Sequence, residues 1–355
     1  MIVKQKIIFF FNTLERTGSE IFLFNLIDCL DLTKFEITIV CFQKAGSLKD
    51  DLKVEVKLID EFIRFNSIDK IINKLGVDVL EKKIHTLLDT INPNICYFNT
   101  IGNLYLLKYI DQSKIKTIVH IHELSSNYSY ITDSDFDALL SSHLLIACSD
   151  LVRQELVDLP AGKIEVINSC PLKLQKPKRS TILGNSSKIR IITSGSISFR
   201  KGTDLWLKII QNLELPNLEF IWLGKNSKNG FARWIELTAN KVSINKKNFK
   251  FIEPQTESEY NSILASGNYF LSTSREESMG IAMMEAQLFG LPVIALNSGG
   301  SELIIRSTDY LISSYQIDDI IRQISHIIEN NKAITNDTCN YSFLDEFKKW
   351  QNLLS

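Results

Sequence analysis

Two glutamates eight positions apart, Glu277 and Glu285, have the spacing in this sequence that most clearly indicates chemistry. Glu277 lies in a polar loop after the apolar run 268–272, and Glu285 lies in a helix predicted to begin near Gly280. The free backbone N–H groups at the start of a helix can hold a phosphate, and a glycine there lets the backbone approach closely. A carboxylate on either side can accept hydrogen bonds from sugar hydroxyls. Together these groups could bind a ligand that has a phosphate in the middle and a sugar at each end, and a nucleotide-sugar is such a ligand.

A simpler interpretation is that the acidic loop only stabilises the N-terminus of the helix, where carboxylates are favoured. Glu285 fits this interpretation less well, because it falls on or near the apolar face predicted from Ile281, Met284 and Leu288. A buried acid needs a partner. We therefore expect Glu285 to have a binding role.

A second candidate segment follows the predicted strand at 189–194. It carries Gly195, Arg200 and Lys201 directly before a helix that begins near Thr203. A glycine-bearing loop with cations at a helix N-terminus has the features of a diphosphate-binding site. Its cations would neutralise the negative charge on a diphosphate as it leaves. The alternative is an ordinary turn between strand and helix with exposed cations, since such turns are frequent.

Two histidines lie near the end of the predicted strand at 117–122. His120 and His122 point to the same face, because side chains alternate along a strand. Structural zinc requires four ligands, and no third ligand lies nearby in the sequence, so we do not expect a metal here. We interpret His120 as a structural residue. His122, at the carboxyl end of the strand, is the candidate for function.

An Asp-x-Asp pattern at Asp133 and Asp135 resembles a metal-binding signature. It precedes a predicted helix, and Asp133 or Ser134 as an N-cap explains it. We therefore do not assign it a metal.

Strands and amphipathic helices alternate through the whole chain, which predicts the α/β class with doubly wound parallel sheets. Residues 171–188, with two prolines, one glycine and five cationic side chains, read as an interdomain linker. The predicted organisation is a domain over 1–170, the linker, a domain over 189–335 and a terminal helical segment over 336–355. The predicted strands are 7–11, 37–42, 54–59, 95–98, 117–122, 144–149, 164–168, 189–194, 218–223, 249–252, 268–273 and 293–296. The predicted helices include 68–75, 78–91, 104–110, 203–213, 230–240, 256–265, 279–289 and 316–330.

Composition excludes some classes of protein. The 40 basic and 41 acidic residues nearly cancel, so net charge indicates no nucleic-acid partner. The six cysteines show no C-x-x-C spacing, which favours a reducing compartment, and there is neither a signal-peptide pattern nor an apolar run of spanning length. We expect a cytoplasmic location. A basic amphipathic helix around Lys70, Lys74, Lys82 and Lys83 fits either peripheral contact with an anionic membrane or an ordinary surface helix.

The segment from Ser274 to Ala286, followed by Gly290-Leu-Pro-Val and Gly299-Gly-Ser-Glu302, resembles the E-x7-E segment of retaining GT-B glycosyltransferases, family four in particular. In that family the first glutamate contacts the donor sugar and the second binds the nucleotide ribose, which assigns these roles to Glu277 and Glu285. The family's usual aromatic residue before the glycine is Met279 here.

The other candidate segments resemble family motifs in the same order. The loop after 189–194 resembles G-R-L-x-x-x-K-G, with Lys201 as the phosphate-binding lysine. The family arginine falls on Ser196, a departure for which Arg200 is the candidate substitute. Thr17-Gly18-Ser19-Glu20 resembles the Gly-Gly-x-Glu loop that approaches the diphosphate, although its first glycine is Thr17. His122 resembles the histidine that reaches the donor sugar.

The resemblance implies two Rossmann-like domains facing across a cleft, with the terminal helix packed back on the first domain. It implies transfer of a sugar, with retention, from a UDP- or GDP-sugar to a hydroxyl of a carbohydrate or lipid-linked acceptor, without metal or other cofactor. Polysaccharide or glycolipid synthesis is the typical setting. Alternatives are an epimerase or hydrolase-like enzyme of the same fold, and an inactive partner-binding subunit, which the Ser196 departure would favour. The catalytic candidates are His122, Lys201 and Glu277. The donor-binding candidates are Gly18, Ser19, Ser196, Arg200, Lys201, Glu277, Met279, Gly280, Ile281 and Glu285.

Overall fold

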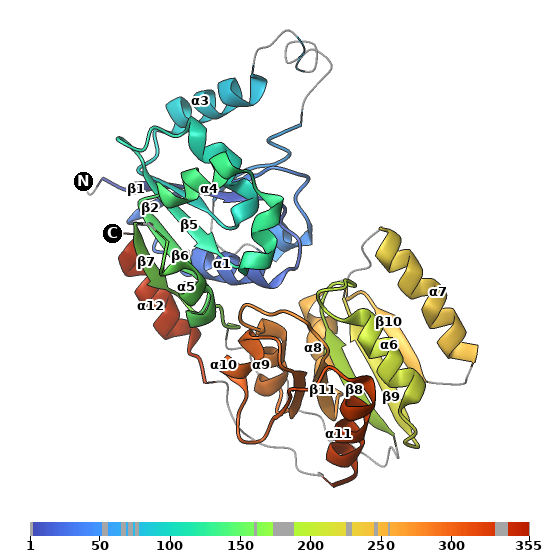
Figure 1. Cartoon of the computed structure of the whole chain (residues 1–355). Helices are drawn as coiled ribbons and strands as arrows, with labels where there is room; N and C mark the ends of the chain where they lie inside the picture. The colour runs from blue at the N-terminus through green and yellow to red at the C-terminus, as the bar shows by residue number, and fades with distance from the viewer. Residues whose placement is uncertain are drawn as a thin grey trace. The chain divides into compact units, whose positions relative to one another are not determined.

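A computed structural model describes residues 3–51, 56–64, 69, 74, 78–159, 162–172, 188–224, 229–244, 248–254, 256–330 and 340–354. Contacts within the chain divide it into two compact units (Figure 1). The N-terminal unit comprises Met1–Leu172 together with Phe343–Ser355, and the C-terminal unit comprises Lys173–Ser342. Most of the predicted linker lies outside the described residues.

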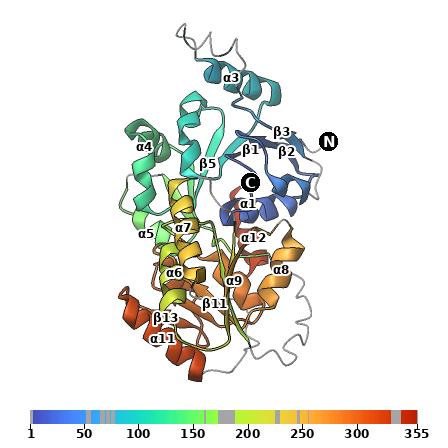
Figure 2. The same ribbon diagram turned by 90° about the vertical axis from the view of Figure 1, so that its right-hand side faces the viewer.

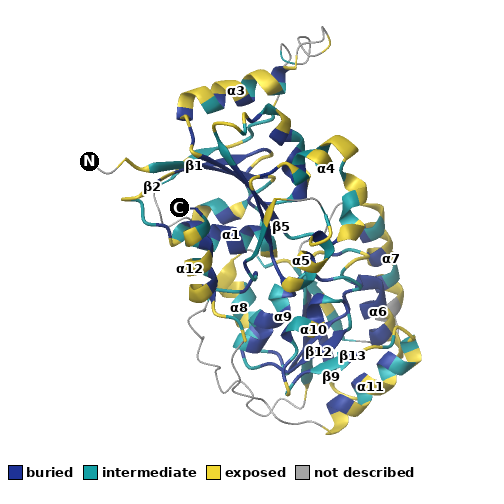
Figure 3. Cartoon of the chain, turned by 60° about the vertical axis from the view of Figure 1, so that its left-hand side comes forward, coloured by how far each residue is buried: buried dark blue, intermediate teal, exposed yellow. Residues whose placement is uncertain are grey.

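The N-terminal unit is built on a sheet of seven parallel strands in the order β3-β2-β1-β4-β5-β6-β7. Its central strand β1 pairs on one side with β2 and on the other with β4, so that Ile7 lies opposite both Ile37 and Ile95. The central strands are buried on both faces (Figure 3), which explains their continuous apolar sequences. The strands are β1 Gln5–Phe11, β2 Phe35–Cys41, β3 Lys57–Ile59, β4 Ile95–Phe98, β5 Lys116–Ile121, β6 Leu144–Ala147 and β7 Lys163–Val166.

Helices cover both faces of this sheet. One face packs its apolar side chains against α3 (Val79–Ile91), the 3₁₀ segment η2 (Ile101–Tyr109), α4 (Asp133–Leu140) and α5 (Asp150–Leu156). The short 3₁₀ segments η1 (Ser47–Asp51) and η3 (Ser125–Tyr130) lie in connections. In α3 the buried residues are Val79, Ile84, Leu87 and Ile91, so its apolar side lies against the sheet and not toward solvent.

The other face carries α1 (Gly18–Asp28) and α12 (Phe343–Leu353), the last helix of the chain. Trp350 of α12 is fully buried, its ring centroid lies 6.1 Å from that of Phe9, and its Nε1–H donates to the Tyr97 hydroxyl at 2.9 Å. Phe343 meets Phe22 of α1 edge to face. The end of the chain therefore completes the core of the N-terminal unit (Figure 1).

The C-terminal unit has six parallel strands in the order β10-β9-β8-β11-β12-β13. Helices α6, α7 and α11 bury Trp206, Ile235 and Ile324 on one face, and α8 lies beside α9 elsewhere in the unit (Figures 2 and 3). The strands are β8 Ile189–Ser194, β9 Leu218–Leu223, β10 Phe249–Ile252, β11 Tyr269–Ser272, β12 Val293–Leu296 and β13 Tyr310–Ile312, and the helices are α6 Thr203–Asn212, α7 Gly230–Ile244, α8 Glu257–Ala265, α9 Ile281–Leu288, α10 Gly300–Ile304 and α11 Ile317–Asn330.

Several sequence expectations differ from this structure. The helix predicted over 104–110 is the 3₁₀ segment η2, and the strand predicted over 54–59 is described only as Lys57–Ile59. Strand β13 and helix α10 were not predicted, because three and five residues are too few to show a periodicity. The helix predicted over 68–75 falls mostly outside the described residues.

Candidate active site

A buried ion pair between Lys201 and Glu277 marks the carboxyl edge of the C-terminal sheet. Lys201 lies in the loop that joins β8 to α6, and Glu277 lies in the loop after the neighbouring strand β11. The Lys201 Nζ atom lies 2.5 Å from Glu277 Oε1, and the Ser274 hydroxyl donates to the same oxygen at 2.7 Å. Glu277 is only 8% exposed. Two residues 76 positions apart thus form one charged group at the edge where open α/β sheets bind ligands.

Opposing effects set the charge state of this pair. Burial alone would raise the pKa of Glu277, but Lys201 and Arg200 outweigh it and hold that pKa below its usual value. Burial lowers the pKa of Lys201, while Glu277 acts in the opposite direction. Glu277 is therefore a carboxylate at neutral pH that is already neutralised by a cation.

Arg200 is the second cation at this edge. Its Nη1 atom lies 4.0 Å from Glu277 Oε2 and donates to the Glu276 backbone oxygen at 3.2 Å. Nearly half of its side chain is exposed. Ser196, in the same loop, is exposed and uncharged. The loop thus supplies its second positive charge from position 200, which is the arrangement expected if Arg200 substitutes for a cation at 196.

Glycine at position 202 allows Lys201 to reach Glu277. Gly202 has a φ of +68°, and a Cβ there would lie 1.9 Å from the Thr273 carbonyl oxygen. The Thr273 hydroxyl closes the contact by donating to the Lys201 and Gly202 carbonyls, both at 3.1 Å. The two loops are therefore packed backbone to backbone, and any side chain at 202 would separate them.

A further ion pair, which no sequence motif indicates, joins the loop after β11 to the start of α6. Arg275 donates through both Nη atoms to the Asp204 carboxylate at 2.7 Å, and its guanidinium lies 3.8 Å from the centre of the Phe199 ring. The Arg275 backbone N–H donates to the Arg200 carbonyl at 2.8 Å. Bidentate pairing adds geometric specificity, so this contact orients the loop that carries Lys201.

Helix α9 begins beside Glu277 without a side-chain cap. Its N-cap is Gly280, with a φ of +87° that favours glycine, and a glycine has no side chain with which to accept a hydrogen bond from the first N–H groups. Glu277 instead faces Lys201, and its backbone pairs with Ser298 and Gly300 at 2.9 and 2.8 Å. The interpretation of the acidic loop as a helix cap is therefore wrong for Glu277. The uncapped N–H groups of α9 can serve an anion.

The predicted buried face of α9 is only partly correct. Met284 is buried, but Ile281 and Leu288 are half-buried, and Met283, Ala286 and Gln287 complete the buried side. Helices α9 and α10 pack together, which brings neighbouring residues of α9 into the interior. Met279, just before the helix, is 2% exposed.

Glu285 is half-buried, and it has a hydrogen-bond partner from a neighbouring helix. The Tyr260 hydroxyl from α8 donates to Glu285 Oε2 at 2.7 Å, and the same hydroxyl lies 3.1 Å from the Ser194 hydroxyl at the end of β8. Burial raises the pKa of Glu285 to about 7, with Tyr260 lowering it and Glu257 raising it further. Neither Tyr260 nor Ser194 has a motif position that the sequence alone would single out.

In the N-terminal unit, Asn99 joins two of the predicted site residues. Its Oδ1 accepts a hydrogen bond from His122 Nε2 at 3.2 Å, and its Nδ2 donates to the Ser19 carbonyl at 3.4 Å. His122 Nδ1 lies 3.4 Å from the Ser169 hydroxyl. Burial lowers the pKa of His122 to about 3, so its imidazole is neutral at physiological pH. Asn99 follows β4, the strand beside β5, and this adjacency is visible only in the sheet order.

His120 has the environment expected of a structural histidine. It is fully buried, its Nδ1 atom lies 2.8 Å from the Tyr97 hydroxyl, and burial lowers its pKa well below the usual value. Its ring centroid lies 4.1 Å from that of His122, so the two rings do share one face of the sheet.

Gly18 and Ser19 form the start of α1, with Thr17 as its N-cap. Glu20 turns back to the preceding loop and accepts hydrogen bonds from the Thr13 backbone N–H and hydroxyl at 3.2 and 2.8 Å. Burial raises the pKa of Glu20 to about 7. The Glu20 carboxylate therefore holds the loop after β1 against the start of α1.

The Asp-x-Asp pattern belongs to a helix start, but its N-cap was predicted one or two residues too late. Thr132 is the N-cap of α4, and it exchanges hydrogen bonds with Asp135 in a capping box. Among the residues that the structure describes, no three His, Cys, Asp or Glu side chains are grouped as metal ligands.

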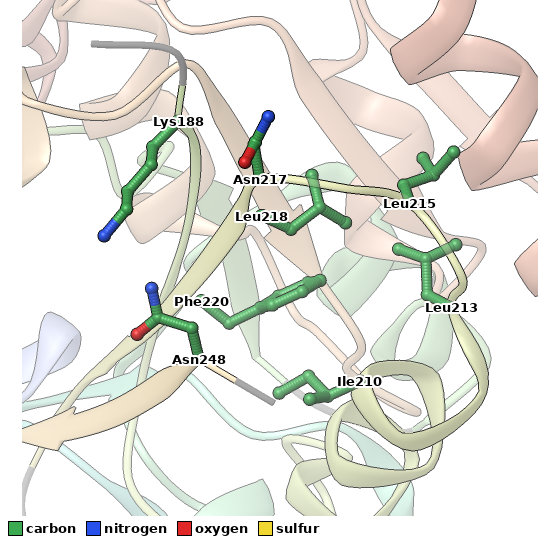
Figure 4. A pocket seen from close by; sticks show the side chains of 8 residues that line it. All are labelled: Lys188, Ile210, Leu213, Leu215, Asn217, Leu218, Phe220 and Asn248. Atoms are coloured by element: carbon green, nitrogen blue, oxygen red, sulfur yellow. The ribbon is translucent and has the colours of Figure 1, made fainter. Parts of the chain in front are cut away.

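A small pocket of about 250 Å³ lies at the opposite, amino edge of the C-terminal sheet (Figure 4). Its lining combines apolar residues such as Leu213, Leu218 and Phe220 with the polar Lys188, Asn217 and Asn248. The pocket contains neither Lys201, Glu277 nor Glu285 and is distinct from the candidate site.

Comparison with solved structures defines the class of this protein. The structure is similar to that of Anabaena HepE, solved in complex with UDP and glucose, with a TM-score of 0.78, 16% identity and coverage of 99% of both chains. It is also similar to the lipopolysaccharide outer core galactosyltransferase WaaB, with a TM-score of 0.65, 15% identity and 98% coverage of both chains. Such low identities establish the fold alone. The chain has the GT-B fold, and the predicted fold class of two Rossmann-like parallel sheets is confirmed.

Sequence comparison then gives the family. Residues 175–341, nearly the whole C-terminal unit, match the family Glycosyl transferases group 1. Together with the fold, this confirms the predicted resemblance to GT-B glycosyltransferases of the family-four type. Curated relatives include a phosphatidylinositol N-acetylglucosaminyltransferase subunit of Arabidopsis thaliana, 24% identical over 55% of this chain, and D-inositol 3-phosphate glycosyltransferase of Mycobacterium marinum, 25% identical over 56%. These matches span 42% and 41% of the relatives' own lengths.

None of the helices within the described residues is both long and apolar enough to cross a membrane.

Proposed function

We propose that this protein transfers a sugar from a nucleotide-sugar to a hydroxyl group of a carbohydrate or lipid-linked acceptor, with retention of configuration at the anomeric carbon. The observation that carries the proposal is the buried Lys201–Glu277 pair beside the uncapped start of α9. This arrangement puts cations and free N–H groups together with a carboxylate at one sheet edge. Anabaena HepE, which has the same fold, was solved with UDP and glucose, which supports a nucleotide-sugar as donor.

In the proposed reaction the bond between the anomeric carbon and the diphosphate oxygen breaks first. Lys201, Arg200 and the N-terminus of α9 stabilise the charge that develops on the leaving diphosphate. The acceptor oxygen then bonds to the anomeric carbon on the same face, and its proton passes to the departed diphosphate. Glu277 holds the donor sugar, and His122 of the N-terminal unit reaches the same sugar as a neutral imidazole.

The nucleotide is proposed to bind with its ribose at Glu285 and its diphosphate near Met279, Gly280 and Ile281. Gly18 and Ser19 would approach the diphosphate from the N-terminal unit. We propose UDP or GDP as the nucleotide. The cleft between the two domains, in which these groups would meet, stays a prediction.

The setting we propose is cytoplasmic synthesis of a cell-surface polysaccharide or glycolipid. The five cysteines within the described residues form no disulfide bond with one another, which supports a reducing compartment. Peripheral membrane contact stays a prediction. Lys82 and Lys83 lie on α3, whose apolar side is already buried, so α3 lends that contact no support.

A panel of donors tests the proposed function. Melting temperatures would be compared for UDP-, GDP-, ADP- and CMP-sugars with the wild-type protein. Stabilisation by one nucleotide class, followed by transfer to an acceptor, is the expected result. Stabilisation with hydrolysis or epimerisation instead of transfer would favour the first alternative enzyme class. A lack of stabilisation by every donor would favour a partner-binding subunit.

Glu285→Ala is expected to weaken nucleotide-sugar binding by about 1–3 kcal/mol, the usual cost of hydrogen bonds left unmade at a binding site. Isothermal titration of the wild type and the variant with the stabilising donor measures the difference. Glu259→Ala is a suitable control, because it removes an exposed carboxylate from the same helix as Tyr260, α8. Equal affinities of Glu285→Ala and wild type would exclude Glu285 as the ribose ligand.

Turnover is expected to be unchanged by EDTA, because Lys201, Arg200 and the α9 N-terminus supply positive charge to the leaving group. The measurement compares initial rates with and without chelator, and with Mg²⁺ or Mn²⁺ added back. Loss of activity with EDTA that the added metal restores would show that a cation is required.

A further inference from the structure

A tyrosine from a helix outside the recognised motifs joins both ends of the donor site. Tyr260 lies on α8, and its hydroxyl meets Glu285 of α9 at 2.7 Å and Ser194 of β8 at 3.1 Å. Ser194 is the last residue of β8, directly before the loop that carries Lys201. Three elements that are separate in the sequence therefore meet at one hydroxyl group.

The chemistry of these three groups fixes the direction of the hydrogen bonds. The Tyr260 O–H donates to Glu285 Oε2, and a tyrosine hydroxyl has only this one proton to donate. The oxygen of that hydroxyl is then the acceptor for the Ser194 O–H. This chain of donors ends on Glu285 Oε2 and holds the carboxylate in one orientation.

The second carboxylate oxygen stays available for a ligand. Within the described part of the chain, hydrogen bonds to Glu285 reach only Oε2. Glu285 is half-buried, so part of its side chain is open to solvent. A carboxylate with one oxygen anchored and the other accessible is suited to accept hydrogen bonds from a vicinal diol such as that of ribose.

We propose that Tyr260 is a positioning residue for nucleoside recognition: it orients Glu285 so that the carboxylate selects a donor with an intact ribose diol. This inference rests on the proposed function and adds a residue that determines specificity at the nucleoside end. It also makes Tyr260 the link between ribose recognition and the strand that opens the phosphate loop, since Ser194 shares its hydroxyl.

The test is a cycle that combines one substitution in the protein with one deletion in the ligand. Dissociation constants would be measured for UDP and 2′-deoxy-UDP, and for GDP and 2′-deoxy-GDP, with wild type and Tyr260→Phe. Phenylalanine keeps the ring and removes only the hydroxyl. For the nucleotide that binds, wild type should prefer the ribose form by about tenfold or more, the size of a hydrogen bond to a charged group. Tyr260→Phe should reduce that preference to about twofold.

Two further variants separate positioning from folding. Ser194→Ala removes the outer member of the chain and should reduce the ribose preference by a smaller factor than Tyr260→Phe. Tyr310→Phe, a half-buried tyrosine on β13 of the same unit, should leave the preference unchanged. A loss of affinity that is equal for the ribose and deoxyribose forms would indicate a merely structural role and would overturn the inference.

The outcomes also distinguish this inference from the proposed function. If wild type binds neither UDP nor GDP and no donor of the panel stabilises it, the proposed function fails and the inference falls with it. If wild type binds one of them and Tyr260→Phe keeps the full ribose preference, only the inference is overturned.

Discussion

Lys201→Ala is expected to lower turnover by about a hundredfold or more, because it removes a cation aimed at charge that develops on the leaving group. In the resting protein Lys201 pairs with Glu277 at 2.5 Å, and both side chains are largely buried. A donor diphosphate would give Lys201 a second anion at the same edge. The loss should therefore appear mainly in kcat, measured as initial rates at saturating donor.

The structure offers a matched control for this variant. Lys208 lies on α6, seven residues further along, and is exposed, so Lys208→Ala should have near-normal turnover. Lys201→Ala also leaves Glu277 without its closest cation, so melting temperatures must show that the variant is folded. If folded Lys201→Ala turns over at nearly the wild-type rate, the role passes to Arg200, whose guanidinium lies 4.0 Å from the same carboxylate.

Asp309→Ala is expected to destabilise the C-terminal unit by about 3–5 kcal/mol, the cost of leaving a buried charge without its partner. The Asp309 side chain is fully buried and accepts from the Arg306 guanidinium at 2.9 and 3.0 Å. It also accepts from the Val293 N–H at 2.9 Å and the Gln287 side chain at 2.8 Å. One carboxylate thus ties β12, α9 and the turn before β13 together, and its removal affects all three.

Urea unfolding measures this effect. Three of the four tryptophans, Trp206, Trp222 and Trp234, belong to the C-terminal unit, so fluorescence reports mainly its transition. Glu236→Ala breaks an exposed pair with Arg233 on α7 of the same unit and should change stability by less than about 1 kcal/mol. A cost of that same small size for Asp309→Ala would show that the Arg306 network does not hold the unit together.

Long segments could be predicted from the sequence because each leaves a recognisable pattern of apolar residues. A strand buried on both faces has a continuous apolar run, and a helix buried on one side has apolar residues at helical spacing. Strands β8, β9 and β10 and helices α3, α8 and α11 lie within one residue of their predicted ranges. Two elements, β13 and α10, were not predicted because they are too short to show a periodicity. The 3₁₀ segment η2 was predicted as an α-helix because its apolar residues fit an α-helix equally well.

The candidate site divides in the same way. Its charged members, Lys201, Glu277 and Glu285, could be selected because each lies in a motif or breaks an apolar pattern. Asn99 and Tyr260 could not, because an asparagine after a strand and a tyrosine on a helix are common in any chain. Their roles depend on which strands and helices are neighbours.

The sequence by itself determined the alternation of strands and helices, the glycine at the start of α9 and the charged residues of two loops. These are local properties, set by apolar spacing and by backbone conformations that favour glycine. Only the tertiary structure decided that Glu277 pairs with Lys201 instead of capping a helix, and that Tyr260 orients Glu285. The physical reason is that a hydrogen bond or ion pair requires contact within about 3 Å, and sheet order, not sequence distance, decides which loops come that close.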